Sequence, residues 1–208
     1  MYKVLLVDDH PVVRKGMKAI LEDQLPGVVV HEAGGGDEAL ALLEAPYDVV
    51  VLDLSMPGRS GIDLLAEIKH RYPKLAVLIV SLHGEEQFAV RALRAGASGY
   101  LTKSAAPELL VTAVAKVARG GRYVSESLAE QLAADVGGRS AAAPHERLSP
   151  REFEVMRGIA SGQTASEIAA AMHLSVKTVS TYRARLLEKM GMANNAELTR
   201  YAIENSLV

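Results

Sequence analysis

The sequence predicts an α/β domain with a doubly wound, five-stranded parallel sheet, followed by a small all-α domain. Up to residue 121, short apolar runs rich in Val, Ile and Leu alternate with segments whose apolar residues recur every three or four positions. Between residues 137 and 146 this periodicity is lost, and from Leu148 onward every segment has helical spacing. The length of 208 residues allows about one or two domains, in agreement with this division.

Five strands are expected where the apolar runs are continuous, because strands covered by helices on both faces are apolar on both faces. Helices are expected between them, with Gly36–Asp37 before the second, Ser60–Gly61 before the third and Pro107 in the first turn of the fifth. Right-handed crossovers then place helices on both faces of the sheet. The predicted strands are Lys3–Val7, Val28–Glu32, Asp48–Leu52, Ala76–Val80 and Ser98–Leu101.

A further amphipathic helix is predicted over residues 125–136, with Leu128, Leu132 and Val136 on its apolar side. Residues 137–146 are rich in Gly, Ser, Ala and Pro, a composition typical of a flexible linker. The two domains are therefore expected to be joined by a partly helical, partly flexible segment.

Four helices are predicted beyond the linker. The first has Ser149 as its N-cap, Pro150 at its first position and Glu152 at its third, and it runs to Ala160. A three-residue turn joins the second and third helices, which indicates a helix-turn-helix. The remaining three helices are Thr164–Met172, Val176–Met190 and one that is capped by Asn194 or Asn195 and ends near Asn205.

Composition excludes several classes of protein. The chain has no cysteine, which excludes disulfides, cysteine-ligated metal sites and a thiol nucleophile. It has no apolar run long enough for a membrane helix, and its N-terminus does not resemble a signal peptide, so we expect a cytoplasmic protein with no membrane partner. From Arg147 to Val208 there are eight Lys and Arg against six Asp and Glu, whereas the preceding part is acidic. Contact with nucleic acid is therefore expected at the C-terminal end.

Polar residues follow four of the predicted strands. Asp8 and Asp9 follow the first strand, and Asp53 follows the third. Ser81 follows the fourth strand, and Lys103 lies two positions after the end of the fifth. In a sheet of order 2-1-3-4-5 the carboxyl ends of strands one and three are adjacent, so the three carboxylates converge. Converged carboxylates favour a divalent cation, and Mg²⁺ prefers oxygen ligands. A carboxylate, a metal ion, a hydroxyl group and a lysine are the groups needed for phosphoryl transfer to an aspartate.

Each of these residues has a simpler explanation on its own. An Asp after a strand is usually a turn residue, and a lone Lys or Ser is usually a solvated surface group. A coincidence of five compatible residues, all at carboxyl ends of strands, is much harder to explain in that way.

The N-terminal part resembles a response-regulator receiver domain over residues 1 to about 121. The similarity is carried by Val7-Asp8-Asp9-His10, Asp53-Leu54-Ser55-Met56-Pro57-Gly58, Ser81 and Lys103. It implies that Asp53 accepts phosphate from a sensor histidine kinase. Lys103 would then pair with phosphoryl oxygens, and Ser81 would hydrogen-bond one of them.

The same resemblance implies that Asp8, Asp9, Asp53 and the backbone carbonyl of Ser55 hold Mg²⁺. Tyr100 stands where receiver domains carry an aromatic residue that turns inward on activation; the alternative is an ordinary half-buried tyrosine in a strand. In one respect the sequence departs from many receivers, because Lys103 is followed by Ser104 and not by a proline in a cis peptide.

The predicted helix Val176–Met190 has two faces. Val179, Leu186, Leu187 and Met190 form an apolar stripe that we expect to be buried. The other face carries Lys177, Ser180, Thr181 and Ala184, with Arg183, Arg185 and Lys189 beside it. A narrow basic face near a helix N-terminus is typical of a helix in the DNA major groove, although a solvated basic helix is the alternative.

Residues from about 147 to 206 resemble the LuxR-type helix-turn-helix, through Leu148-Ser-Pro-Arg-Glu152, Glu167-Ile-Ala169 and Ser175-Val-Lys-Thr-Val179. Joined to a receiver, the chain resembles the NarL/FixJ class of response regulators. The resemblance implies roles for individual residues and a dimer contact through the last helix. Lys177, Ser180, Thr181 and Ala184 would read bases. Thr178, Tyr182 and Arg185 would contact phosphates, and Lys189 would complete the DNA contact.

We therefore expect a receiver domain over 1–122, a linker over 123–146 and a DNA-binding domain over 147–208. The expected function is a two-component transcription regulator that dimerises and binds double-stranded DNA on phosphorylation. RNA polymerase is a further candidate partner. Enzymatic chemistry is expected only as Mg²⁺-dependent phosphorylation and dephosphorylation of Asp53 itself.

Two alternatives stay open. In the first, the chain is a phosphohydrolase that passes an external phosphoester through Asp53. In the second, it is a DNA-binding protein whose receiver serves only for dimerisation. The linker and basic end argue against the first, and the complete acidic set argues against the second.

Overall fold

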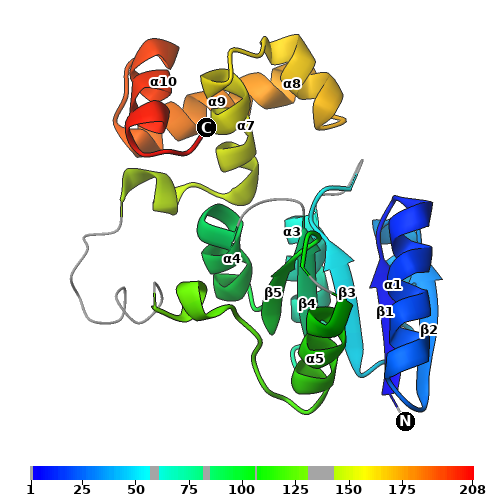
Figure 1. The fold of residues 1–208 in the computed structure, drawn as a ribbon. Coiled ribbons are helices and arrows are strands. Elements are labelled where there is room, and N and C mark those ends of the chain that lie inside the picture. The colour runs from blue at the N-terminus through cyan, green and yellow to red at the C-terminus, as the bar shows by residue number, and fades with distance from the viewer. Residues whose placement is uncertain (1, 57–60, 82–84, 106, 131–142) are drawn as a thin grey trace. The chain divides into compact units, whose positions relative to one another are not determined.

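A computed structural model describes residues 2–56, 61–81, 85–105, 107–130 and 143–208 (Figure 1). The chain divides into two compact units, Met1–Val136 and Gly137–Val208. Leu132, Val136 and the other residues of 131–142, half of the predicted linker, lie outside the described residues. The domain boundaries proposed from the sequence stay predictions. No helix within the described ranges has both the length and the apolar character needed to cross a membrane.

The first unit contains a five-stranded, all-parallel sheet of order β2-β1-β3-β4-β5, which confirms the predicted fold class. All five predicted strands are present, and most run one residue further at their carboxyl end than the sequence indicated. Asp53 pairs with Val80, and Ser81 pairs with Thr102, so both polar residues are the last of their strands. The strands are β1 Tyr2–Val7, β2 Val28–Ala33, β3 Val49–Asp53, β4 Ala76–Ser81 and β5 Gly99–Thr102.

Helices cover both faces of this sheet (Figure 1). Helices α1 and α5 contact each other and pack their apolar sides on one face, where Met17, Leu21 and Val114 meet Leu6 and Val51. Helices α2 and α3 contact each other elsewhere on the sheet, and α4 packs beside β5. The helices are α1 Pro11–Gln24, α2 Gly36–Leu42, α3 Gly61–Arg71, α4 Glu85–Arg94 and α5 Pro107–Ala118.

Helix α3 begins in direct contact with the end of β3. A β-carbon on Gly61 would lie 2.3 Å from the backbone oxygen of Asp53 and 2.5 Å from Cα of Leu54. The amide nitrogen of Gly61 also donates to the carbonyl oxygen of Leu54. Only glycine permits this approach, which places the start of α3 against the backbone of Asp53.

The segment after α5 returns to the open side of β5. The amide of Tyr123 donates to the oxygen of Ser98, and the oxygen of Tyr123 accepts from the amide of Tyr100, both at 3.0 Å. A β-carbon on Gly99 would lie 2.6 Å from the oxygen of Tyr123, so this close pairing also requires glycine. Further on, residues 126–130 are helical, and Leu128 is fully buried.

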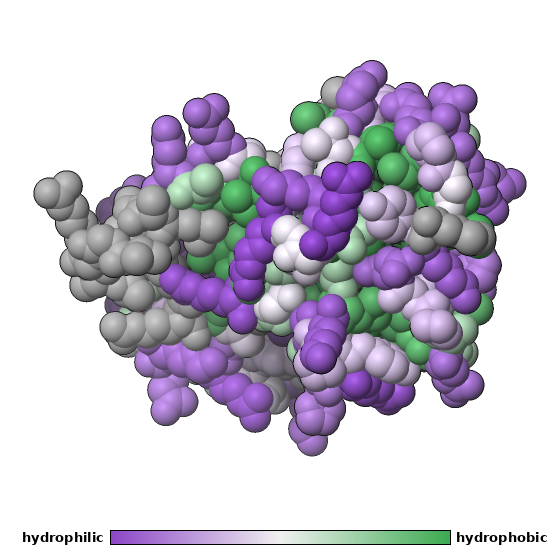
Figure 2. Space-filling view, turned by 90° about the horizontal axis from the view of Figure 1, so that it is seen from below, coloured by the Kyte–Doolittle hydropathy of each residue, from purple (hydrophilic) through white to green (hydrophobic). Residues whose placement is uncertain are grey.

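The amino end of the sheet carries a groove of about 770 Å³ between the loops before β3 and β4. Tyr47, Tyr72, Pro46 and Pro73 are among its lining residues, and it contains none of the predicted site residues. Figure 2, seen from below the view of Figure 1, shows hydrophobic residues visible between hydrophilic side chains. The predicted site residues lie at the opposite end of the sheet, where the parallel strands finish and where ligands of such sheets bind.

The second unit is helical, as predicted, and the caps expected at Ser149 and at Asn194 are present. Ser149 and Thr164 form reciprocal capping boxes with Glu152 and Glu167, and Asn194 caps the last helix. Three boundaries differ slightly from the prediction. The second helix lacks the predicted first and last residues, because Thr164 and Met172 are its N-cap and C-cap, and the last helix ends one residue early. The elements are η1 Pro144–Arg147, α7 Pro150–Ala160, α8 Ala165–Ala171, α9 Val176–Met190 and α10 Asn195–Glu204.

Candidate functional site

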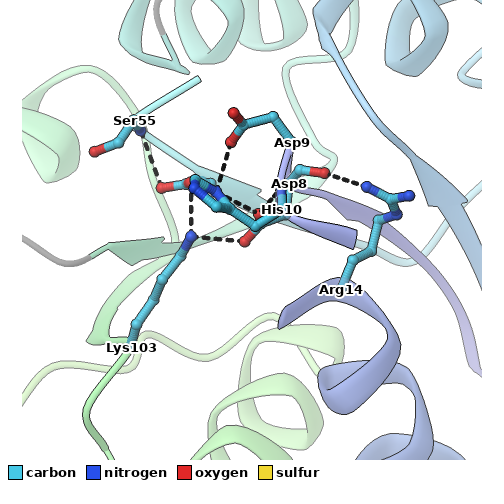
Figure 3. Close-up of polar contacts among 7 residues, drawn as sticks. Asp8, Asp9, His10, Arg14, Ser55 and Lys103 are labelled. Carbon is cyan, nitrogen blue, oxygen red and sulfur yellow. Dashed lines mark hydrogen bonds and ion pairs between the residues drawn. The ribbon is translucent and has the colours of Figure 1, made fainter. Parts of the chain in front are cut away.

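Lys103 brings together two carboxylates at the carboxyl end of the sheet (Figure 3). Its Nζ lies 2.7 Å from Oδ2 of Asp8, which follows β1, and 2.7 Å from Oδ2 of Asp53, which ends β3. The strand order predicted this convergence, because β1 and β3 are neighbours and β5 supplies the lysine from beyond β4. All three side chains are nearly fully buried.

Burial alone would lower the pKa of Lys103, because the charged form loses its water. The hydrogen bonds and charges of Asp53 and Asp8 outweigh this effect and raise the pKa of Lys103 above its ordinary value. The lysine is therefore a permanent cation at physiological pH. With Asp9 included, three carboxylates face one ammonium group, which leaves two negative charges for a further cation to neutralise.

The acidic set fits a divalent cation. Oδ2 of Asp8 and Oδ1 of Asp9 are both buried, and each faces one nitrogen in the described part of the chain: Nζ of Lys103 at 2.7 Å and Nδ1 of His10 at 2.9 Å, respectively. Ligand atoms of Asp8, Asp9, His10 and Asp53 all lie within 4.8 Å of one another. Clustered carboxylate oxygens that outnumber the neighbouring cations are the arrangement that a hard cation such as Mg²⁺ satisfies.

His10 is part of this cluster, although the sequence did not single it out. Its Nδ1 lies 2.9 Å from Oδ1 of Asp9 and 3.4 Å from Oδ1 of Asp8, and its amide donates to Oδ1 of Asp8 at 2.7 Å. Its position directly after two acidic residues was the only signal in the sequence. The imidazole ring is more than half exposed, at the solvent side of the site.

Of the other predicted residues of this site, Ser81 ends β4, Ser55 lies two residues beyond β3, and Tyr100 lies within β5. Ser55 donates its amide to Oδ1 of Asp53 at 3.0 Å, so the two oxygens of that carboxylate have different partners, Ser55 and Lys103. Ser81 is fully buried, and its carbonyl accepts from the amide of Lys103. Tyr100 is also fully buried and not half-buried as the alternative required. No peptide bond among the described residues is cis.

Helix α9 of the second unit presents the polar face that its sequence predicted. Val179, Leu186, Leu187 and Met190 are buried against the other helices. Lys177, Ser180, Thr181 and Ala184 are all exposed, and so is Arg185. The side-chain cations of Lys177 and Arg185 contact no acceptor within the described residues, so both remain available to an anionic partner.

The hydroxyl groups on this face are oriented by the helix itself. Oγ of Ser180 donates to the carbonyl of Val176 at 2.9 Å, and Oγ1 of Thr181 donates to the carbonyl of Lys177 at 3.0 Å. Each hydroxyl hydrogen is therefore used within the helix, while its oxygen lone pairs face outward. In this arrangement the two side chains act as acceptors, which suits the exocyclic amino groups of adenine and cytosine.

Lys189 differs from the other predicted DNA contacts. Its Nζ donates to Oε2 of the buried Glu152 at 2.7 Å, and the same oxygen accepts from the amide of Ser149. The ammonium group thus joins α9 to the N-terminus of α7. The contact of Lys189 with DNA stays a prediction, and its position already has a structural explanation.

The second unit is expected to lose stability in acid through Glu152. Burial would raise the pKa of this carboxyl group, but the hydrogen bond from Lys189 and those from Ser149 outweigh burial and lower the pKa below the ordinary value of 4.5. Because the folded-state pKa is lowered, this stabilisation is complete above about pH 4.5 and is lost as pH falls through the lower folded value.

Glu152→Gln keeps a side chain suited to the capping box but removes the charge. At neutral pH we expect the unfolding free energy of this unit to fall by about 1–2 kcal/mol, with less change between pH 6 and pH 3 than in the wild type. Urea titrations followed by the amide NMR signals of α7 to α10 would measure both. Glu188→Gln on the exposed side of α9 is the control. Equal pH dependence in wild type and Glu152→Gln would contradict the assignment.

Both parts of the chain match models of known families. Residues 4–115 match the response regulator receiver domain, and residues 146–202 match the bacterial regulatory proteins of the luxR family. These are the two families that the motifs around Asp53 and in α9 resemble. The receiver match alone spans more than half of the chain.

Several known proteins are similar to this chain over its whole length. The chain is 38% identical to the response regulator UvrY of Escherichia coli O6:H1 and 37% identical to the response regulator GacA of Pseudomonas aeruginosa, covering all of this chain in both cases. It spans 96% and 98% of those relatives. The structure of RcsB from Salmonella enterica serovar Typhimurium, bound to promoter rprA with the phosphomimetic BeF₃⁻, matches with a TM-score of 0.66. That match has 30% identity and covers 97% of this chain and 98% of RcsB.

Proposed function

The chain belongs to the NarL/FixJ class of two-component response regulators, which join a receiver to a LuxR-type DNA-binding domain, and we propose that Asp53 is its phosphate acceptor and that phosphorylation of Asp53 controls DNA binding. One observation carries this proposal. Lys103 holds Asp53 and Asp8 together at 2.7 Å, in a buried site open to a divalent cation. A charged, largely buried and preorganised site of this kind is suited to a reaction that develops charge on phosphoryl oxygens.

In the reaction, a carboxylate oxygen of Asp53 attacks the phosphorus atom of the donor. A bond from that oxygen to phosphorus forms, the bond from phosphorus to the histidine nitrogen of a sensor kinase breaks, and the nitrogen keeps the electron pair. The new phosphoryl group carries more charge than the carboxylate it replaces, so Lys103 transfers its hydrogen bond to a phosphoryl oxygen. Ser81, at the end of β4, donates its hydroxyl to another.

Asp8, Asp9 and Asp53, together with the backbone carbonyl of Ser55, would hold Mg²⁺ in this site. When bound, the ion supplies positive charge that offsets the repulsion between the carboxylates and the incoming phosphate. The chemistry of the protein itself is then limited to gaining this phosphate and losing it to water.

Phosphorylation is coupled to DNA binding through changes in the receiver around Ser81, Lys103 and Tyr100. A coupling of about 1–3 kcal/mol, which changes DNA affinity about 5- to 150-fold, would be sufficient for a switch. The output is a homodimer that binds two half-sites in double-stranded promoter DNA, with α9 in the major groove and RNA polymerase as a further partner. The setting is the cytoplasm, where a sensor kinase and DNA are both accessible.

The proposal is tested with the full-length chain, acetyl phosphate and Mg²⁺. Peptide mapping by mass spectrometry is expected to locate one phosphoryl group on Asp53. Light scattering with beryllofluoride and Mg²⁺ is expected to show a dimer, with tighter binding to promoter DNA. Phosphate on another residue would overturn the assignment of Asp53. Steady release of phosphate from many donor molecules, without any effect on DNA binding, would favour a phosphohydrolase instead.

Removal of one phosphate contact is expected to reduce the salt dependence of DNA binding. In the Arg185→Ala protein, the slope of log affinity against log salt concentration should become smaller by about one, with similar loss on specific and unrelated DNA. Lys177→Ala is the matched comparison, because a base contact changes the ratio of specific to non-specific affinity instead. Fluorescence anisotropy at several salt concentrations measures both quantities. An unchanged slope for Arg185→Ala would exclude Arg185 as a phosphate contact.

A further inference from the structure

Arg14 on α1 lies beside the acidic site, and no step of the proposed phosphorylation uses it (Figure 3). Its Nη1 donates to the backbone oxygen of Asp8 at 2.5 Å, and its Nε donates to Oε2 of Glu32 at 3.1 Å. The side chain is only 16% exposed. One rigid guanidinium group therefore connects the residue after β1 to the carboxylate of a residue on β2.

Glu32 is held from a second side by Lys18, whose Nζ lies 3.3 Å from Oε1. Burial would raise the pKa of Glu32, but Lys18 and Arg14 outweigh burial and lower the pKa, so the carboxylate is ionised at neutral pH. The ionised carboxylate of Glu32 thus holds the guanidinium group of Arg14 in place through an ion pair. The two cations differ in one respect: Arg14 contacts Asp8 as well, whereas Lys18 contacts Glu22 and Glu32.

The other polar groups of Asp8 are also engaged. Its amide donates to the oxygen of Ala33, its Oδ1 accepts from the amide of His10, and its Oδ2 lies beside Lys103. The carbonyl group lies beyond the last pair of the β1–β2 ladder, Val7 with Ala33. Arg14 thus supplies a donor to this carbonyl where the strand ladder has ended.

We propose that Arg14 is a positioning residue for the metal site, and that Glu32 acts through it. The carbonyl of Asp8 and the amide of Asp9 belong to one planar peptide group, so a bond to the carbonyl fixes the plane from which Asp9 extends. Arg14 thereby orients Asp9, which contributes a buried carboxylate oxygen to the cluster of possible metal ligands. This inference rests on the proposed Mg²⁺ site.

The test is a calorimetric Mg²⁺ titration of the full-length protein. Arg14→Lys keeps the positive charge but replaces two fixed donors by one flexible ammonium group. We expect it to raise the Mg²⁺ dissociation constant about tenfold, the effect typical of losing an outer-shell partner of a metal ligand. Lys18→Gln is the matched control, because it removes a cation from the same Glu32 without touching Asp8, and should leave the constant unchanged.

Two further measurements separate positioning from general destabilisation. Urea unfolding in EDTA should give similar free energies for Lys18→Gln and Arg14→Lys, although their Mg²⁺ affinities differ. Glu32→Gln should also weaken Mg²⁺ binding and should add nothing in the Arg14→Lys background, because the two residues act as a unit.

An unchanged Mg²⁺ constant in Arg14→Lys would overturn the inference, and so would an equal loss in Lys18→Gln. Both results leave the proposed function intact. A wild-type protein that binds no Mg²⁺ would instead refute the proposed metal site, and the role of Arg14 with it.

Discussion

Asp53→Asn is expected to abolish phosphorylation without unfolding the receiver. Asparagine has nearly the same shape as aspartate, but its amide cannot form an acyl phosphate, so phosphate incorporation from acetyl phosphate should fall to background. Lys103 keeps its partner Asp8 at 2.7 Å, and the three carboxylates of the site become two. Because their repulsion is reduced, the metal-free variant should be at least as resistant to urea as the wild type.

Intact-mass measurement and urea titrations in EDTA together check this prediction. Asp23→Asn, an exposed substitution on α1, removes the same charge away from the site and should take up phosphate normally. DNA binding by Asp53→Asn should no longer respond to acetyl phosphate. Incorporation that persists in this variant would show a different acceptor, and a large loss of stability would show that Asp53 is chiefly a structural partner of Lys103.

Gly61→Ala is expected to have the largest effect on stability of any single methyl group added to the receiver. The new β-carbon would lie 2.3 Å from the backbone oxygen of Asp53, far inside van der Waals contact, and no flexible side chain can move aside. Overpacking of this kind costs about 3 kcal/mol, near the upper end of the usual range. To remove this clash, α3 or the backbone at Asp53 must move. A displacement of Asp53 by about 1 Å can slow phosphorylation about 100-fold.

Gly16→Ala provides the opposite control. Nothing lies within 4 Å of a β-carbon at this exposed position of α1, so alanine should raise the unfolding free energy by about 0.5–1 kcal/mol through helix propensity. Urea unfolding and the initial rate of phosphate incorporation distinguish the two variants. Similar values for Gly61→Ala and wild type would mean that the start of α3 does not restrain Asp53.

The sequence predicted the architecture well because its signals are local. Each apolar run in the first 121 residues became a strand, and each cap in the C-terminal part started a helix. The strand order, together with the rule that ligands bind at carboxyl ends, was also enough to bring Asp8 and Asp53 together. Ser149 and Asn194 show the same point, because a cap and its partner are only three residues apart.

What the sequence did not reveal are pairings between charged residues on different elements. Arg14 and Glu32 are 18 residues apart, and Lys189 and Glu152 are 37 apart. In the hydrophobic pattern of the sequence, each of these four residues is an ordinary polar position on a helix or strand. A charged residue has the same effect on that pattern whether it is solvated or paired. Lys189 was therefore assigned to DNA contact with its neighbours on α9, whereas the structure shows its ammonium group on Glu152.

The pairing of Tyr123 with β5 has a practical consequence for dissecting the molecule. In the described structure, β5 borders β4 on one side, and its other side is occupied at Ser98 and Tyr100 by the backbone of Tyr123. A receiver fragment cut at residue 122 would lose both hydrogen bonds and expose an unprotected apolar sheet edge. Such edges recruit strands from other molecules, so this fragment would aggregate where one ending at residue 130 stays monomeric. We therefore expect the few residues that follow α5 to protect the receiver from edge-to-edge association.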